Sequence, residues 1–413
     1  MQKKGDLKTI TLGCRFNTYE TEKARALLSG FDLDADVIFI NTCAVTREAE
    51  RQSKQTVRRA IRDNPAAKVI VTGCATQTSR EYFQQLNGIF RIVDNDKKHL
   101  PESYISVPHS GQRPVQDEKL FKDRIRAFIQ VQNGCDHFCS YCIVPFTRGR
   151  SRSLPLNIIL DQVEYFARNK FKEIVISGID ITSYGKDLGN ISLVELIKAI
   201  LSTYPEIDRL RLSSVDPAMV DGPLLELFIS EKRIMPHLHM SIQAGDNDVL
   251  KIMRRRHTRE QTIDICNKIL ERRNDVVLGG DIIAGFPTET ASMFRNTLAL
   301  IDEAKLSLLH VFPYSKRDGT LAAKMPQLPH EVIFERAKIL RDKANAAQQK
   351  LFNSLIASEI PGIVEKSVGN TIYGKTDSFL RFKSSSGRFQ TGDVVYGMHV
   401  TGYTADSLIT ECG

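Results

Sequence analysis

Residues 135–142 read Cys135-Asp136-His137-Phe138-Cys139-Ser140-Tyr141-Cys142 and closely follow the apolar run Phe128-Ile129-Gln130-Val131, which predicts a buried strand. Three thiolates on one short loop can hold three irons of a four-iron cluster and leave the fourth iron without a protein ligand. An open metal position is typical of a catalytic site, because a structural site fills it. The loop therefore predicts a catalytic iron–sulfur centre after the first strand of a barrel.

Two other interpretations of this loop stay open. His137 could complete a structural zinc site as its fourth ligand. Cys139 and Cys142 could instead form a redox pair, which would leave Cys135 without a role.

The surrounding region alternates strand and helix patterns. Strand candidates begin near residues 126, 173, 209, 237, 278 and 308. Helical patterns follow at 156–169, 191–203, 222–231, 259–273, 290–304 and 330–351. Six strand–helix units are fewer than the eight of a closed barrel, so we expect an open partial (β/α)6 barrel over residues 124–351.

Before this region, the chain predicts a small doubly wound α/β domain over residues 1–105. Its apolar strands are expected at 8–13, 36–41, 68–73 and 88–94, and its helices at 18–29, 45–63 and 79–86. Residues 106–123 are expected to form a linker, since they mix Pro, Gly, Gln and charge without a period. Residues 352–413 predict a small all-β barrel, because glycines separate short alternating runs.

A second group of cysteines lies in the N-terminal region. Cys14, Cys43 and Cys74 each follow one of its first three expected strands. The carboxyl ends of parallel strands share one edge of a sheet, where ligands bind, so the three thiols are expected to converge. The sequence thus predicts a second cluster with one open iron, against the alternative of three unrelated core cysteines.

The composition bounds the class of protein. The chain has 413 residues, more than the roughly 250–300 at which one hydrophobic core stops growing, so we expect two or three domains. Eight cysteines in such a chain favour metal binding or catalysis over a disulfide framework. The first residues lack an apolar stretch, and no run reaches the roughly 18 apolar residues of a membrane span. We expect a cytoplasmic protein without a membrane partner.

The C-x3-C-x2-C loop resembles that of the radical S-adenosylmethionine enzymes, and the N-terminal trio with a C-terminal β-domain resembles the methylthiotransferases among them. Three segments look most like the branch that acts on N6-threonylcarbamoyladenosine at position 37 of tRNA. These are Asn41-Thr42-Cys43-Ala44-Val45-Thr46, Arg148-Gly149-Arg150-Ser151-Arg152-Ser153 and His310-Val311-Phe312-Pro313-Tyr314-Ser315-Lys316-Arg317.

This resemblance implies two [4Fe-4S] clusters, one on each cysteine trio, and two molecules of S-adenosylmethionine per turnover. One molecule is cleaved at the first cluster and yields the radical that takes hydrogen from carbon 2 of the adenine. The second cluster presents sulfur, and the second molecule supplies the methyl group. The resemblance also implies a reducing electron donor, a sulfur donor and the anticodon stem-loop of tRNA as partners.

The resemblance further places contacts to S-adenosylmethionine at the ends of the barrel strands. The turn Ser177-Gly178-Ile179-Asp180 would meet the amino group, although Ile179 replaces a glycine of the wider superfamily's pattern. The other expected contacts are Ser213 and Ser214 to the ribose, Gln243, and Gly285 beside the adenine.

Cations mark the expected RNA surface, and the net charge of +8 is compatible with a polyanion partner. One face of the helix over 45–63 carries Arg47, Arg51, Lys54, Arg58 and Arg62. Near the expected active-site rim lie Arg148, Arg150, Arg152, Arg254, Arg255, Arg256 and Arg317. A pocket for the threonylcarbamoyl carboxylate should offer such a cation, and Arg148, Arg150, Arg152 and Arg317 are the candidates.

The C-terminal domain resembles a TRAM-like RNA-binding barrel. Residues 351–413 nevertheless hold five Lys and Arg against six Asp and Glu, a net charge of −1. Binding there would need local patches and stacking aromatics, for which the candidates are Arg381, Lys383, Arg388, Phe379, Phe382 and Phe389.

Other functions remain possible on the sequence alone. The same chemistry could act on isopentenyladenosine 37 of tRNA or on a ribosomal protein. A more distant alternative is a non-enzymatic iron–sulfur or zinc RNA-binding protein, although such a module has no need of the barrel.

Overall fold

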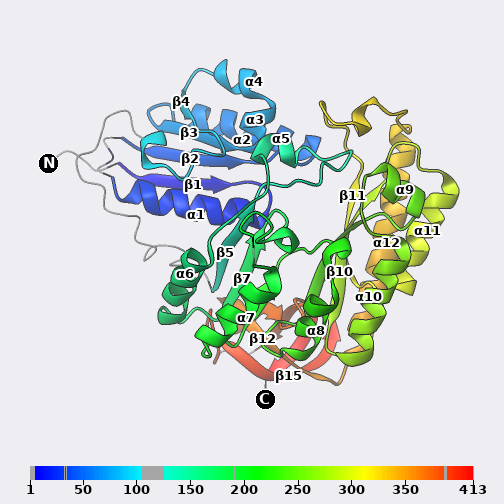
Figure 1. Cartoon of the computed structure of the whole chain (residues 1–413). Helices are drawn as coiled ribbons and strands as arrows, with labels where there is room; N and C mark the ends of the chain where they lie inside the picture. Colours follow the sequence, from blue (N-terminus) through cyan, green and yellow to red (C-terminus); the bar gives the residue numbers. More distant parts are fainter. Residues whose placement is uncertain are drawn as a thin grey trace.

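The computed structural model describes residues 5–31, 33, 35–104, 125–189, 191–385 and 388–412. The expected linker over 106–123 lies outside these residues. Figure 1 shows an N-terminal α/β part at the top, a curved sheet with helices in the middle and a β-barrel at the bottom. This arrangement confirms the expected fold class, while the exact domain boundaries stay predictions. No helix in the described part of the chain is long and apolar enough to span a bilayer.

The N-terminal part is a four-stranded parallel sheet in the order β1-β2-β3-β4. Its strands are β1 (Leu7–Thr11), β2 (Val37–Thr42), β3 (Lys68–Gly73) and β4 (Ile89–Ile92). Its helices are α1 (Arg15–Ser29), α2 (Arg47–Asp63), α3 (Cys74–Thr78) and α4 (Arg80–Gln84). Alternate residues of β2 enter different hydrophobic clusters: Ile38 packs with Val57 of α2, and Phe39 packs with Leu28 of α1. Both faces of the sheet are therefore covered, as a doubly wound domain requires.

The middle part is an arc of six parallel strands, as expected. They are β5 (Arg126–Asn133), β7 (Glu173–Gly178), β8 (Leu210–Leu212), β9 (His237–Gln243), β10 (Val277–Ala284) and β11 (Leu308–Pro313). Isolated parallel bridges join β8 to β9. The short strand β6 (Arg152–Ser153) is antiparallel to β5. The order β6-β5-β7-β8 then β9-β10-β11 leaves the arc open.

Helices cover the outside of this arc. The expected ones are α6 (Leu156–Arg168), α7 (Leu193–Thr203), α8 (Gly222–Ser230), α10 (Arg259–Arg272), α11 (Ala291–Glu303) and α12 (His330–Ser354). Two short helices escaped the sequence patterns, α5 (Val144–Arg148) and α9 (Asn247–Ile252). The main core lies between strands and helices and contains Cys266, which is fully buried on α10. Its expected packing role is confirmed.

The C-terminal part is a closed five-stranded barrel in the order β12-β13-β14-β16-β15. Its strands are β12 (Glu359–Val368), β13 (Thr371–Thr376), β14 (Arg381–Ser385), β15 (Val394–Tyr403) and β16 (Leu408–Cys412). Phe382 is 1% exposed and fills its interior. A Cβ at Gly374 would lie 2.7 Å from the Phe382 ring, so a glycine is needed there. The expectation that Phe382 could stack on RNA is wrong, because its ring is buried in the barrel core against side chains such as Ile372 and Met398.

The barrel sits on the amino ends of the arc's strands. Phe379 stacks on His237 at 5.2 Å and lies 4.7 Å from the guanidinium of Arg211. Beside it, the buried Glu173 pairs with Arg211 at 2.7 Å, and Arg209 pairs with Asp377 of the barrel at 2.6 Å. Phe379 therefore holds the two parts together, which corrects its expected role in RNA stacking. Figure 1 places this contact at the end of the molecule opposite the N-terminal sheet.

Candidate active site

The loop between β5 and α5 carries Cys135, Cys139 and Cys142, all partly exposed. Its backbone is pinned to distant segments: Ser140 N–H donates to the Met253 carbonyl at 3.0 Å, and Ala322 N–H donates to the Ser140 carbonyl at 2.8 Å. Such contacts fix the positions of thiols that would otherwise lie on a mobile loop.

The three thiols form one electrostatic group, because the pKa of each of Cys135 and Cys142 responds to the neighbouring Cys139. Burial raises the pKa of Cys135 and of Cys142 to about 12. In this environment thiolates form only when a positive charge binds them, as a metal does. Backbone N–H groups already point at two of the sulfurs, from His137 at 3.5 Å and from Val144 at 3.4 Å. The donor set fits a cluster bound through three cysteines.

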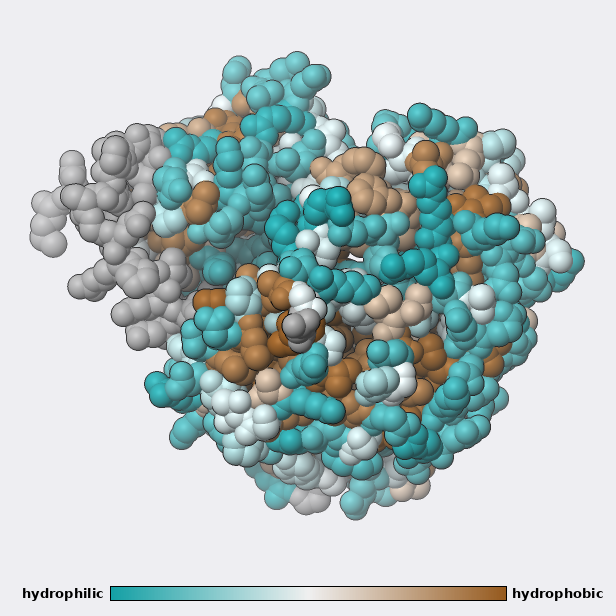
Figure 2. Space-filling model, in the orientation of Figure 1, coloured by the Kyte–Doolittle hydropathy of each residue, from teal (hydrophilic) through white to brown (hydrophobic). Residues whose placement is uncertain are grey.

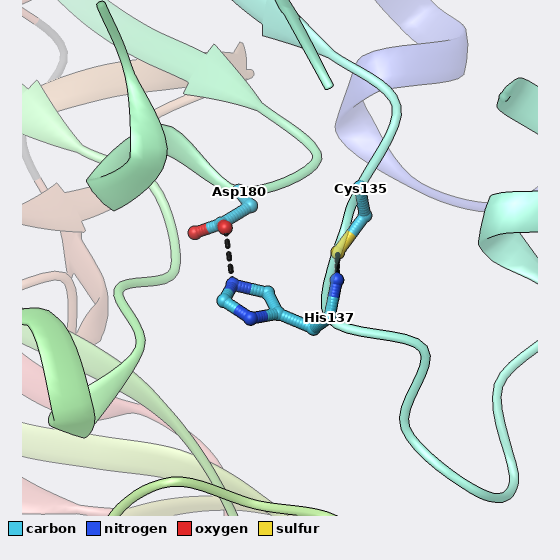
Figure 3. A group of neighbouring side chains, drawn as sticks. All are labelled: Cys135, His137 and Asp180. Atoms are coloured by element: carbon cyan, nitrogen blue, oxygen red, sulfur yellow. Dashed lines mark hydrogen bonds and ion pairs between the residues drawn. The ribbon is translucent and has the colours of Figure 1, made fainter. Parts of the chain in front are cut away.

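The His137 ring is used elsewhere (Figure 3). Its Nε2 lies 2.5 Å from Asp180 Oδ2 and 2.8 Å from Arg256 Nη2. Cys135 Sγ, a His137 ring nitrogen and an Asp180 oxygen lie within 4.8 Å of one another, a set that could hold a metal ion. A guanidinium against the same nitrogen would repel that ion. The geometry therefore argues against the zinc site with His137 as a ligand.

Asp180 is held rigidly behind the loop. Its carboxylate accepts hydrogen bonds from Thr182 Oγ1 at 2.6 Å and from Ser183 Oγ at 2.5 Å. Although burial raises the pKa of Asp180, hydrogen bonds from His137 and the two hydroxyls outweigh it and lower the pKa to about 2. Asp180 thus stays ionised and orients His137, and its expected contact with S-adenosylmethionine remains a prediction.

Gln132 is a site residue that the sequence did not suggest. It is fully buried on β5, and its Oε1 accepts from the N–H of Ile179 at 3.1 Å and of Asp180 at 2.8 Å. Its Nε2 donates to the Gly134 carbonyl at 2.8 Å. Gln132 therefore ties the turn after β7 to the start of the cysteine loop. A Cβ at Gly178 would lie 3.0 Å from the Gln132 carbonyl, which accounts for the glycine.

The remaining expected cofactor contacts end successive strands. Ser213 and Ser214 follow β8, and their hydroxyls are buried without a hydrogen-bond partner among the described residues. Buried hydroxyls usually have partners, so these two are suited to bind a ligand. Gln243 ends β9 with a φ of +70°. Gly285 follows β10 with a φ of +72°, and a Cβ there would lie 2.9 Å from Ile333 Cα, so the glycine also serves helix packing.

The second trio converges as expected. Cys14 precedes α1, Cys43 follows β2 and Cys74 begins α3, all at the carboxyl edge of the parallel sheet. Burial, with a smaller contribution from the other two thiols, raises the pKa of Cys43 to about 11. A Cβ at Gly13 would lie 2.6 Å from Cys43 Sγ, so this glycine lets β1 approach the thiol. Ser53 of α2 fixes Cys43 by accepting from its N–H at 3.0 Å and donating to its carbonyl at 2.8 Å.

The two trios are physically joined. Ile143, directly after Cys142, is 5% exposed and packs in the N-terminal core with Cys74 and Ala44. Helix α5, which follows it, packs against α3. The Cys135–Cys142 loop is thus anchored at the edge of the N-terminal sheet. Figure 2 shows a hollow on this face between the two parts, with hydrophobic residues along the part below it.

Arg148 is buried. Its side chain is 2% exposed, and its guanidinium pairs with Glu20 at 2.9 Å and donates to Asn17 Oδ1 at 2.6 Å. Lys98 also pairs with Glu20, at 2.5 Å. The expectation that Arg148 meets the modified base is corrected, because this guanidinium is already saturated between the arc and the N-terminal sheet.

Arg317 is similarly engaged. It is 6% exposed and pairs with Glu50 of α2, which also pairs with Lys54 at 2.7 Å. Its expected contact with the substrate is corrected, because the side chain is buried in this ion pair. Arg150 is exposed but pairs with Asp136 at 2.6 Å, and exposed Arg152 donates to the Arg148 carbonyl at 3.1 Å.

The expected cationic face of α2 is present. Arg47, Arg51, Arg58 and Arg62 are exposed on it. Arg51 pairs with Glu48 at 2.7 Å and Arg62 with Asp63 at 2.9 Å, which reduces the charge that the face presents. RNA binding by Arg51 and Arg58 stays a prediction.

We expect Arg148→Ala to lower the free energy of unfolding by about 3–5 kcal/mol, the range for removing one partner of a buried ion pair. Lys98 alone would then neutralise Glu20, and Asn17 would lose its donor. Thermal denaturation under anaerobic conditions measures the loss. The neighbouring Arg150→Ala serves as the control and should leave the Tm unchanged, since its ion pair is exposed. Equal melting of both variants would contradict the structural role of Arg148.

Two protein-family models match this chain and define the class of protein. The model of the Radical SAM superfamily matches residues 129–301, which span the cysteine loop and most of the arc. A second model, Uncharacterized protein family UPF0004, matches residues 6–93 with all three N-terminal cysteines. The fold and the three-cysteine loop thus define a radical SAM protein with an additional N-terminal domain.

Relatives of similar length narrow the class. The chain is 44% identical to Threonylcarbamoyladenosine tRNA methylthiotransferase MtaB of Rickettsia prowazekii, over 91% of this chain and 90% of that protein. It is 32% identical to a tRNA-2-methylthio-N(6)-dimethylallyladenosine synthase of Staphylococcus epidermidis, over 89% of this chain and 77% of that protein. The chain belongs to the radical S-adenosylmethionine methylthiotransferase family, and of these two relatives the threonylcarbamoyladenosine enzyme is the more similar.

Solved structures agree on the fold. The radical S-adenosylmethionine methyltransferase TsrM of Kitasatospora setae superposes with a TM-score of 0.53 at 15% identity, covering 75% of this chain and 74% of that one. At this identity the match supports the shared architecture alone.

Proposed function

We propose that this protein is a tRNA methylthiotransferase that converts N6-threonylcarbamoyladenosine 37 to its 2-methylthio derivative. One observation carries the proposal: Ile143 anchors the Cys135–Cys142 loop in the same hydrophobic core that holds Cys74, so the loop with one thiol trio is fixed beside the sheet edge that carries the other. A methylthiotransferase needs this arrangement, because the carbon that loses hydrogen must also reach the sulfur. The 44% identity to the Rickettsia prowazekii enzyme supports the choice of substrate.

The residues that would hold the cofactors follow from the site. Cys135, Cys139 and Cys142 would hold one [4Fe-4S] cluster, and Cys14, Cys43 and Cys74 a second. When bound, the first cluster with S-adenosylmethionine supplies a radical that removes hydrogen, and the second cluster supplies sulfur. An external reductant, an external sulfur source and a second molecule of S-adenosylmethionine as methyl donor would complete the chemistry.

The chain's own side chains position the reactants. Gln132 fixes the turn at Gly178. Ser213 and Ser214 would receive the ribose of S-adenosylmethionine, which their buried hydroxyls without a hydrogen-bond partner among the described residues support. Arg255 is 3.6 Å from Cys139 Sγ and also donates to the Ser241 carbonyl at 2.7 Å. The Arg255 cation would stabilise the negative charge that the Cys139 sulfur carries when it binds a metal as a thiolate.

The anticodon stem-loop would approach the hollow across the exposed cations of α2. Basic side chains on this face would contact phosphates, which gives binding that weakens with salt. The C-terminal barrel is a further RNA surface in this proposal, with Arg381 and Arg388 exposed on it.

Nucleosides from cells with and without the protein test the substrate. We expect the 2-methylthio form of N6-threonylcarbamoyladenosine to disappear from tRNA when the protein is absent, while the unmethylthiolated nucleoside accumulates. Complementation with the wild-type chain should restore it, and the Cys74→Ala chain should not. Loss of 2-methylthio-isopentenyladenosine, or of a modification on a ribosomal protein, would replace the proposed substrate with one of those alternatives.

A further inference from the structure

Two histidine side chains converge on one carboxylate oxygen of Asp281 on the strand between them. His239 Nε2 lies 3.0 Å from Asp281 Oδ1, and His310 Nδ1 lies 3.1 Å from the same oxygen. They come from β9, β10 and β11, where Asp281 and His310 are register partners. One donor atom from each residue falls within 4.8 Å of the others. We call these residues the His–Asp–His triad.

The triad belongs to the inward face of the strands. His239 and Ser241 alternate along β9 with Leu238, Met240 and Ile242, which pack in the core. Two residues along a strand span about 6.6 Å, so the triad lies roughly that far below Ser241. Ser241 is the residue whose carbonyl and hydroxyl accept from Arg255, the guanidinium beside Cys139. The triad therefore lies below the cysteine loop, on the same inward face of the strands as Ser241.

Its shape suits a metal ion. Two imidazoles and one carboxylate are the ligands of sites that keep open positions for a substrate. In an octahedral site, ligands at right angles and about 2.1 Å from an ion are about 3.0 Å apart, close to the 3.0 Å and 3.1 Å between Asp281 Oδ1 and the two imidazole nitrogens. The His310 side chain is 65% exposed, whereas His239 and Asp281 are 14% and 26% exposed, so the site is open on one side only. A Cβ at Gly279 would lie 3.3 Å from His239 Nδ1, so this glycine leaves room for the ring.

A metal ion at the triad could supply the positive charge that the substrate's carboxylate needs. The threonylcarbamoyl group ends in a carboxylate, which needs a cation in a pocket. Arg148 and Arg317 are buried in ion pairs, and Arg150 is paired with Asp136. The fourth candidate, Arg152, donates to the Arg148 carbonyl at 3.1 Å. With neutral imidazoles the triad carries one negative charge, and a divalent ion converts it to one positive charge.

We propose that His239, Asp281 and His310 bind a divalent metal ion, and that the open side of this ion takes the carboxylate of the threonylcarbamoyl group. The metal site follows from the triad alone, whereas its ligand rests on the proposed function. The ion is separate from the two clusters, since none of its ligands is a cysteine.

Metal analysis tests the site directly. The full chain, reconstituted anaerobically with its clusters, is equilibrated with Zn²⁺, freed of unbound ion and analysed for zinc and iron. We expect about one zinc per chain in the wild type and none in His310→Ala or Asp281→Asn, with iron unchanged in both. His399→Ala, at an exposed histidine of β15, is the control and should keep its zinc. A wild type without zinc, or variants that retain it, would overturn the proposal.

Substrate preference tests the ligand. An anticodon stem-loop with the threonylcarbamoyl group is compared with one lacking it, at saturating S-adenosylmethionine. For His310→Ala we expect kcat/KM on the modified RNA to fall by about tenfold or more, the loss typical of a contact to a charged group. Retention of the full preference for the modified RNA would overturn the carboxylate role. Methylthiolation by a zinc-free wild type would do the same and would leave the proposed function intact.

Discussion

Cys74→Ala is expected to abolish the methylthio product while S-adenosylmethionine is still cleaved under reducing conditions. Cys74 is 5% exposed at the start of α3 and belongs to the N-terminal trio. The thiols that bind the cleavage cluster belong to a different loop, whose contacts to Met253 and Ala322 do not involve Cys74. Removing one ligand should disable the sulfur-bearing site and spare the other. Product mass and 5′-deoxyadenosine are measured in the same reaction.

Cys266→Ala provides the matched control for this variant. Cys266 is also a buried cysteine, but it lies on α10 in the core of the arc, far from either trio in the sequence. We expect it to form the methylthio product at close to the wild-type rate. A normal yield from Cys74→Ala would exclude the N-terminal trio as the carrier of sulfur. Loss of cleavage as well as product would show that the two sites are not independent.

Replacing Cys135, Cys139 and Cys142 together by Ala should halve the iron content, from about eight to about four irons per chain, since each cubane cluster holds about four. The same triple variant should cleave no S-adenosylmethionine. The remaining iron should be lost only when the N-terminal trio is replaced as well. Iron and zinc are determined after anaerobic reconstitution.

His137→Ala separates this expectation from a zinc site on the loop. In the structure His137 Nε2 faces Asp180 and Arg256, so its removal should leave the iron content unchanged. A wild type that holds zinc and no iron, with zinc lost in His137→Ala, would replace the cluster with a structural metal site. Complete loss of iron in the triple variant would contradict two separate sites.

The positions of the cysteines could be inferred from the sequence because strand ends are readable. Apolar runs mark where β1, β2 and β3 finish, and in a parallel sheet those ends share an edge whatever the loops do. To predict that Cys14, Cys43 and Cys74 converge, it was therefore enough to know the direction of the strands. The same reasoning located Ser213, Gln243 and Gly285 at successive strand ends of the arc, although their roles stay predictions.

The roles of the arginines could not be inferred in this way. Whether Arg148 faces a substrate or Glu20 depends on a pairing across 128 positions of sequence, which no local pattern records. A run such as Arg148-Gly149-Arg150 also looks uniform, yet the helical turn of α5 buries the first guanidinium and leaves the second exposed. Arg317 and Glu50 pair over a still longer separation.

The His–Asp–His triad was missed for a related reason. Asp281 and His310 are single charged or titratable residues within apolar strands, and His239 is one of several polar residues that alternate along β9, so no local pattern marks any of the three. Only the register of β10 against β11 and the inward direction of all three side chains bring them together. A search for isolated histidines and acids on the inward positions of adjacent strands could have found them.

The position of the C-terminal barrel limits which part of an RNA it can bind. It rests where β5, β7, β8 and β9 begin, whereas the cysteine loop lies where β5 ends, eight residues or about 26 Å further along. Any nucleotide bound by the barrel is therefore remote from the reacting base. A short RNA hairpin would lose its contacts with the barrel but could still place the base at the cysteine loop. Deleting the barrel would not test this cleanly, because Arg209 would lose its ion pair with Asp377 and Arg211 its contact with Phe379. Both arginines would then be exposed at the amino ends of the strands.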